Sequence, residues 1–126
     1  MKKIIHTENA PKAVGPYSQA VEANGMLFIS GQIPMDPSTG KIVEGGIVEQ
    51  TRQVMENIGA ILKEAGYHYN DVIKSTCLLD NMDNFGDMNK VYADYYPENP
   101  PARAAFGVVK LPLGVMIEIE TIAVKS

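Results

Sequence analysis

Apolar residues recur along the chain with two different spacings, and the change of spacing separates helices from strands. Between Gly46 and Gly66 they fall three and four residues apart, with charged residues between them, which predicts an amphipathic helix. Gly66 stands where a glycine commonly ends a helix. A second stripe with helical spacing runs from Asp83, a suitable N-cap residue, to about Tyr95. The sequence therefore predicts two helices.

Other apolar segments favour β-strands, because they are short and rich in β-branched residues. The main ones cover residues 26–30, 72–79, 103–109 and 115–124, with shorter extended pieces near Ile4 and Tyr17. Strands and helices thus alternate irregularly, which predicts the α+β class: a mixed sheet with two helices packed on one face. The length of 126 residues suits a single domain over residues 1–126.

The last two predicted strands indicate what covers the other face of the sheet. Because side chains alternate along a strand, one face of residues 115–124 is apolar and suits packing under helices. The opposite face is apolar at its ends and carries Glu118 and Glu120 in the middle. In the strand before it, Arg103 shares a face with small residues, which suggests close approach by another element. We expect a neighbouring subunit to cover this second face, with Arg103 and Glu118 in a partly buried cleft at the interface.

Two interpretations of these charges remain open. Arg103 can form a structural ion pair with Glu118 or Glu120, as is common in subunit interfaces. One arginine against two carboxylates leaves one carboxylate unmatched, however, and an unmatched buried carboxylate has a raised pKa that suits proton transfer. Glu120 fits a structural role, a second acid or a contact between subunits.

Composition and sequence limit the compartments and the partners that we expect for this protein. The net charge of −4 disfavours binding to nucleic acid. The first residues contain too few apolar positions to form an export signal, and no apolar run is long enough to cross a bilayer, so a cytoplasmic protein is expected, with no membrane partner. Cys77 is the single cysteine and is expected to be a small core residue. His6 and His68 lack metal-ligand spacing, and the sequence predicts neither a metal site nor a cofactor.

Five motifs occur in order along most of the chain. They are Gly15-Pro16-Tyr17-Ser18-Gln19-Ala20, Ser30-Gly31-Gln32-Ile33-Pro34, Phe85-x-x-x-Asn89-x-x-Tyr92, Pro101-Ala102-Arg103, and Leu111-Pro112 through Ile117-Glu118-Ile119-Glu120. With these motifs in register, the chain resembles the RidA family, also called the YjgF or reactive-intermediate-deaminase family. The resemblance extends from Thr7 to the C-terminus.

This resemblance implies a chorismate-mutase-like fold assembled as a homotrimer, with a central β-barrel, helices outside and active clefts between subunits. It also implies hydrolysis of reactive enamines and imines, such as 2-aminoacrylate and 2-aminocrotonate, to 2-oxo acids and ammonia. An alternative of another class is a non-catalytic trimer that binds small 2-oxo acids or related carboxylates as a sensor. Ribonuclease activity is attached to the wider family, but the acidic balance of the chain argues against it.

The resemblance implies roles for individual residues. Arg103 matches an arginine that binds the substrate carboxylate, which a planar guanidinium can hold through two hydrogen bonds. Glu118 matches a glutamate that positions a water or shuttles its proton. The other residues expected to line the cleft are Tyr17, Ser30, Gly31 and Asn89.

The chain departs from many bacterial members at one position. They carry cysteine two residues after the arginine, whereas this chain has Ala105. A mechanism that needs a thiol at this position is excluded, and the backbone carbonyl of Ala105 becomes the candidate to hold the water.

Overall fold

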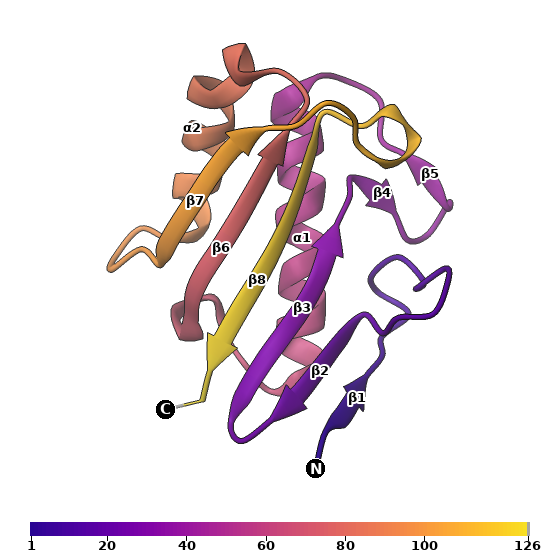
Figure 1. The fold of residues 1–126 in the computed structure, drawn as a ribbon, viewed down its shortest axis with the longest axis vertical. Helices are drawn as coiled ribbons and strands as arrows, with labels where there is room; N and C mark the ends of the chain where they lie inside the picture. The colour runs from indigo at the N-terminus through magenta and orange to yellow at the C-terminus, as the bar shows by residue number, and fades with distance from the viewer. Residues whose placement is uncertain (126) are drawn as a thin grey trace.

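The computed structural model of the protein describes residues 1–125, which form a mixed six-stranded sheet with two helices on one face (Figure 1). The sheet order is β1-β2-β3-β8-β6-β7, and every neighbouring pair is antiparallel except the parallel β6–β7. The bounds of these strands are β1 Lys3–Ile5, β2 Ala20–Ala23, β3 Met26–Gln32, β6 Val72–Leu79, β7 Ala102–Gly107 and β8 Ile117–Val124. A small hairpin pairs β4 (Met35–Asp36) with β5 (Lys41–Ile42). The predicted α+β class is confirmed.

Helix α1 (Ile47–Ala65) lies along the sheet and confirms the longer predicted helix. Its apolar stripe is fully buried against the sheet at Val54, Ile58 and Ile61, which expose none of their surface. Gly66 adopts a φ of 83°, so it ends the helix in the left-handed conformation that glycine permits.

Helix α2 (Phe85–Tyr95) covers the β6–β7 side of the same face, and its start differs from the prediction. Asp83 is not the N-cap. The side chain of Asn81 instead accepts a hydrogen bond of 2.9 Å from the Asp83 backbone N–H and begins a 3₁₀ turn, η2 (Met82–Asn84), that leads into α2. A short acceptor side chain at either position satisfies a free N–H group, and the chain turns at the earlier one.

Strand β8 has the predicted alternation of faces. Ile117, Ile119, Thr121 and Ala123 expose at most 1% of their surface and lie under the helices. The strand begins at Ile117 rather than at residue 115, because a 3₁₀ turn, η3 (Pro112–Gly114), precedes it.

The opposite face of the sheet carries apolar side chains that no element of residues 1–125 covers. Both helices lie behind the sheet in Figure 1, and its front face is open. Phe28 on β3 exposes 44% of its surface and Phe106 on β7 exposes 49%, although both lie within the sheet. No helix formed by these residues is long and apolar enough to span a membrane.

Candidate active site

Glu118 projects from the open face of β8 and lies directly against Gly31. The β3–β8 pairing shifts register between Ile29 and Gln32, so Ser30 and Gly31 form an irregularity in β3. A side chain at position 31 would overlap the Glu118 carboxylate. Glycine at this position therefore lets the Glu118 carboxylate lie directly against the backbone of β3, and the Ser-Gly pair forms the floor on which the carboxylate rests.

The environment of Glu118 favours its neutral form. Burial raises the pKa of this carboxyl above its ordinary value of about 4.5, and the charge of Glu120 adds to the shift. Within residues 1–125, no salt bridge involves Glu118. The carboxyl is thus half-buried, without a cationic partner, and suited to exchanging a proton.

Ser30 fastens the loop that carries Tyr17 to β3. Its Oγ donates a hydrogen bond of 2.6 Å to the Ser18 carbonyl, and its N–H donates one of 2.9 Å to the Gln19 carbonyl. Tyr17 exposes 53% of its surface and lines a cavity of about 320 Å³ together with Gly31. The structure therefore brings Tyr17, Ser30, Gly31 and Glu118 to one region.

Gln19 holds this loop in place, a role that the sequence-based analysis missed. It exposes only 2% of its surface. Its amide oxygen accepts a hydrogen bond of 2.7 Å from the Thr7 N–H, and its Nε2 donates to the carbonyls of Thr7, Ala10 and Pro11. The sequence carried one sign of this role, because Gln19 belongs to the same Gly-Pro-Tyr-Ser-Gln-Ala motif that pointed to Tyr17.

Arg103 projects from β7 toward α2. Its Cζ lies 4.9 Å from the ring centre of Tyr92 and 5.4 Å from that of Phe85. No carboxylate of residues 1–125 lies within salt-bridge distance of this guanidinium. Arg103 lines a cavity of about 490 Å³ with Asn89, whose buried Oδ1 has no hydrogen-bond partner among these residues. An unpaired guanidinium beside a free amide oxygen is an arrangement that can bind a small carboxylate with an N–H group.

The expectation that Arg103 shares the open face with Glu118 is wrong for a single chain. In the parallel β6–β7 ladder Arg103 pairs with Ser75, which is fully buried under the helices, whereas Glu118 pairs with Leu78 on the open face. The two side chains therefore lie on opposite faces, and they form no ion pair within the chain. The close approach that small residues suggested is made by η2, because Met82 Cγ would lie 3.2 Å from a side-chain carbon at Gly107.

Three other residues named from the sequence are also placed. Ala105 pairs with Cys77 on the helix-bearing face. Cys77 exposes none of its surface, and burial raises the pKa of its thiol to about 11, which confirms it as a core residue. Glu120 is exposed on the open face, in a cavity of about 230 Å³ that also contains Lys74.

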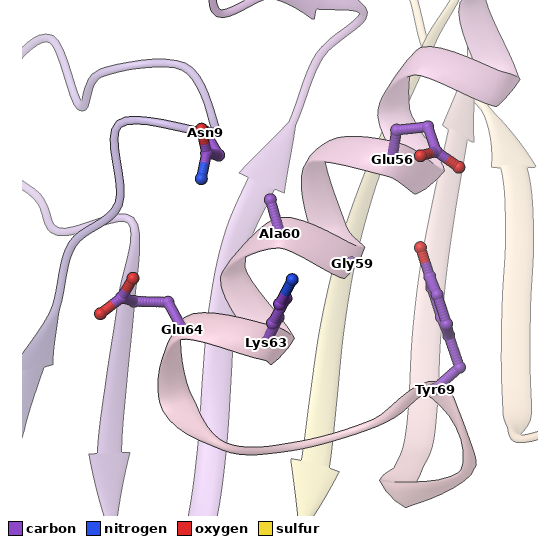
Figure 2. A pocket seen from close by; sticks show the side chains of 7 residues that line it. All are labelled: Asn9, Glu56, Gly59, Ala60, Lys63, Glu64 and Tyr69. Atoms are coloured by element: carbon purple, nitrogen blue, oxygen red, sulfur yellow. The ribbon is translucent and has the colours of Figure 1, made fainter.

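A larger hollow, of about 620 Å³, lies away from these residues on the outer side of α1 (Figure 2). Figure 2 shows Glu56, Lys63 and Glu64 around it, with the Tyr69 ring reaching across toward the helix. Gly59 leaves room for that ring, whose hydroxyl donates a hydrogen bond of 2.7 Å to the Met55 carbonyl. The Tyr69 ring, held against the helix in this way, forms one wall of the hollow.

Comparison with known proteins agrees with the motifs. Residues 7–125 match the family model described as Endoribonuclease L-PSP. The chain belongs to this family, the RidA/YjgF family. It is 61% identical over 126 residues to a RutC family protein of Pyrococcus horikoshii, with 100% of each chain covered. It is 49% identical to mouse 2-iminobutanoate/2-iminopropanoate deaminase, with 100% of this chain and 92% of the relative covered.

The solved structure of E. coli TdcF with bound serine has the same fold. The TM-score is 0.93 at 42% identity, with 98% of this chain and 99% of that chain covered. In this RidA chain the family's motif residues form two groups. Arg103, Asn89 and Ala105 lie toward the helix-bearing face at the β7 edge, and Tyr17, Ser30, Gly31 and Glu118 lie around the β3–β8 irregularity.

Proposed function

We propose that the protein hydrolyses reactive 2-enamine and 2-imine acids, such as 2-aminoacrylate, to 2-oxo acids and ammonia. The observation that carries this proposal is a pair of uncompensated groups: a guanidinium without a carboxylate and a half-buried carboxyl without a cation among residues 1–125. The deaminase name of the mouse relative supports it. So does the serine bound to TdcF, because serine carries the carboxylate and α-nitrogen that such substrates also carry.

The two groups meet when the protein is a homotrimer in which the sheets form a central β-barrel. The open apolar face of the sheet supplies the contact surface, since exposed Phe28 and Phe106 are stabilised by burial. A cleft between subunits then joins Arg103 of one chain to Glu118 of its neighbour. Each half of the site is incomplete alone, which explains why neither charge is paired within residues 1–125 of one chain.

Arg103 and Asn89 bind the substrate in this proposal. The guanidinium holds the carboxylate through two parallel hydrogen bonds, and the free Oδ1 of Asn89 accepts an N–H from the substrate nitrogen. Tyr17 closes the cleft from the neighbouring chain, and backbone groups at Ser30 and Gly31 lie close to the ligand. These contacts fix the imine carbon relative to the attacking water.

Glu118 performs the proton transfers. The enamine first tautomerises to the imine. The carboxylate then orients a water toward the carbon of the protonated imine and accepts a proton from this water as the C–O bond forms, giving a neutral carbinolamine. Glu118 returns this proton to the carbinolamine nitrogen. The C–N bond then breaks as the C=O bond forms, and the hydroxyl group gives its proton to the departing ammonia, which leaves as ammonium. A single acid–base group accelerates a reaction about 10²–10⁴-fold. This rate enhancement is enough for imines, which also hydrolyse spontaneously in water.

Ala105 replaces the cysteine that many bacterial relatives carry. Because β7 is the outer strand of the sheet, backbone groups on its outer side have no partner strand within residues 1–125. The Ala105 carbonyl is thus available to hold the attacking water.

A sensor that binds 2-oxo acids without turnover would use the same Arg103 clamp. The two functions are separated by generating 2-aminoacrylate in the presence of the purified protein and following pyruvate. A deaminase releases pyruvate faster than buffer alone does, whereas a rate equal to that in buffer contradicts the proposal. The endoribonuclease description of the family model is not favoured by a chain with a net charge of −4.

A further inference from the structure

Helix α2 presents two aromatic rings to the guanidinium of Arg103. Phe85 and Tyr92 are seven residues apart, which places them on the same side of the helix. Asn89 lies between them and lines the same cavity as Arg103. The ring centres of Tyr92 and Phe85 lie 4.9 Å and 5.4 Å from Arg103 Cζ, within the range of a cation–π contact.

The Tyr92 ring is itself held rigidly. It exposes 5% of its surface and packs against Tyr96 with ring centres 4.8 Å apart. Burial raises the pKa of its hydroxyl, so the phenol stays neutral at physiological pH. A rigid neutral ring beside a flexible arginine limits the rotamers that the arginine samples.

Ring contacts differ from an ion pair because they leave the N–H donors of the guanidinium free. A carboxylate partner would occupy the N–H donors of the guanidinium, whereas a ring attracts the cation through its face and takes up no hydrogen-bond donor directed at a ligand. Arg103 has ring partners and no carboxylate partner among residues 1–125. It is thereby oriented and still able to bind an anion.

We propose that Phe85 and Tyr92 are positioning residues that hold the Arg103 guanidinium ready for the substrate carboxylate. This inference rests on the proposed function for the identity of the ligand. Tyr92 also packs in the core between α2 and the sheet, and its contact with Arg103 adds a second role. Removing either ring leaves Arg103 present but free to take other rotamers, so carboxylate binding weakens without loss of the charge.

The test compares pyruvate with its uncharged amide, pyruvamide, by titration calorimetry on the intact assembly. Phe85→Leu and Tyr92→Leu remove the rings, and Tyr92→Phe keeps the ring while losing the hydroxyl. Tyr95→Leu is the matched control, because Tyr95 lies on the same helix and its ring faces Arg52 rather than Arg103. Phe85 is only partly buried, so Phe85→Leu carries the test if Tyr92→Leu folds poorly.

We expect each ring-to-leucine change to weaken pyruvate binding about tenfold, equivalent to about 1.4 kcal/mol, while pyruvamide binding stays unchanged. KM for 2-aminoacrylate should rise by a similar factor with a smaller change in kcat, and Tyr92→Phe and Tyr95→Leu should keep the wild-type preference for pyruvate. An unchanged preference in folded Phe85→Leu and Tyr92→Leu overturns the inference. Wild-type protein that does not prefer pyruvate to pyruvamide overturns it as well, whereas preference for pyruvate without turnover contradicts only the deaminase proposal.

Discussion

The contact between Gly31 and Glu118 allows stability and activity to be separated by one substitution. In Gly31→Ala the new Cβ would overlap a carboxylate oxygen of Glu118 and would lie 2.9 Å from its Cδ and 3.1 Å from its Cγ. Because real Cβ atoms do not approach other heavy atoms so closely, the Glu118 side chain has to move.

The expected stability change is small. Rotating Glu118 away from its preferred geometry costs about 0.5–1.5 kcal/mol. Alanine also restricts the unfolded chain, which contributes about 0.4–1 kcal/mol in the opposite direction where the backbone is compatible. Gly31 is compatible, since its φ is not positive. The two effects nearly cancel, so the free energy of unfolding should change by less than about 1 kcal/mol, whereas displacing the carboxylate by about 1 Å should lower kcat about 10²-fold.

The assay pairs urea unfolding with pyruvate release from 2-aminoacrylate generated in place. Gly86→Ala is the matched control, because Gly86 lies in α2 and the methyl group of an alanine there would meet no neighbouring side chain within 4 Å. It should keep the wild-type kcat and gain up to about 1 kcal/mol of stability. A wild-type kcat in Gly31→Ala would refute the reasoning, and so would a loss of about 3 kcal/mol or more, which would make the contact a structural one.

Three further predictions concern Arg103, Glu118 and Cys77. Arg103→Ala and Arg103→Lys should each lower kcat/KM about 10–100-fold, because a charge-assisted bidentate contact contributes about 1.5–3 kcal/mol; steady-state kinetics with a normal kcat/KM in either variant would remove Arg103 from substrate binding. Activity should fall as the pH drops through the raised pKa of Glu118, since only the carboxylate accepts a proton. A Glu118→Gln variant that keeps the wild-type rate and the same fall of activity at low pH would exclude Glu118 as the base. The Cys77 thiol, with its pKa raised to about 11, should resist a disulfide reagent at pH 8 until the protein unfolds, and rapid labelling of the native protein would contradict its burial.

The sequence predicts those features that depend on local patterns. The 3.6-residue spacing defines α1 because its buried stripe faces a sheet along its whole length, and Gly66 ends it through a backbone conformation that glycine favours. The alternation in β8 correctly separates Ile117 and Ile119 from Glu118. Both signals are set by residues that lie close together in the chain.

The face of the sheet on which Arg103 lies cannot be predicted from the residues near it in the sequence. Alternation shows that Arg103 and Ala105 share a face, but the parallel pairing of β7 with β6 decides which face that is. The same holds for the aromatic contacts of Arg103, which require α2 to lie over β7. The predicted N-cap of α2 is wrong for a different reason: both Asn81 and Asp83 can cap a helical turn, and the structure uses Asn81 to begin η2, so that α2 itself starts two residues after Asp83 with Asn84 as its N-cap.

Division of the active site between two chains is the central claim, and subunit mixing tests it most directly. Arg103→Ala and Glu118→Gln are each purified, mixed in equal amounts, unfolded together and refolded. In a cyclic trimer with clefts between subunits, about three-quarters of the assemblies contain both variants and each has one intact cleft out of three, so activity should recover to about a quarter of the wild-type value. A mixture no more active than the two separate variants, with trimers formed, would contradict a shared site.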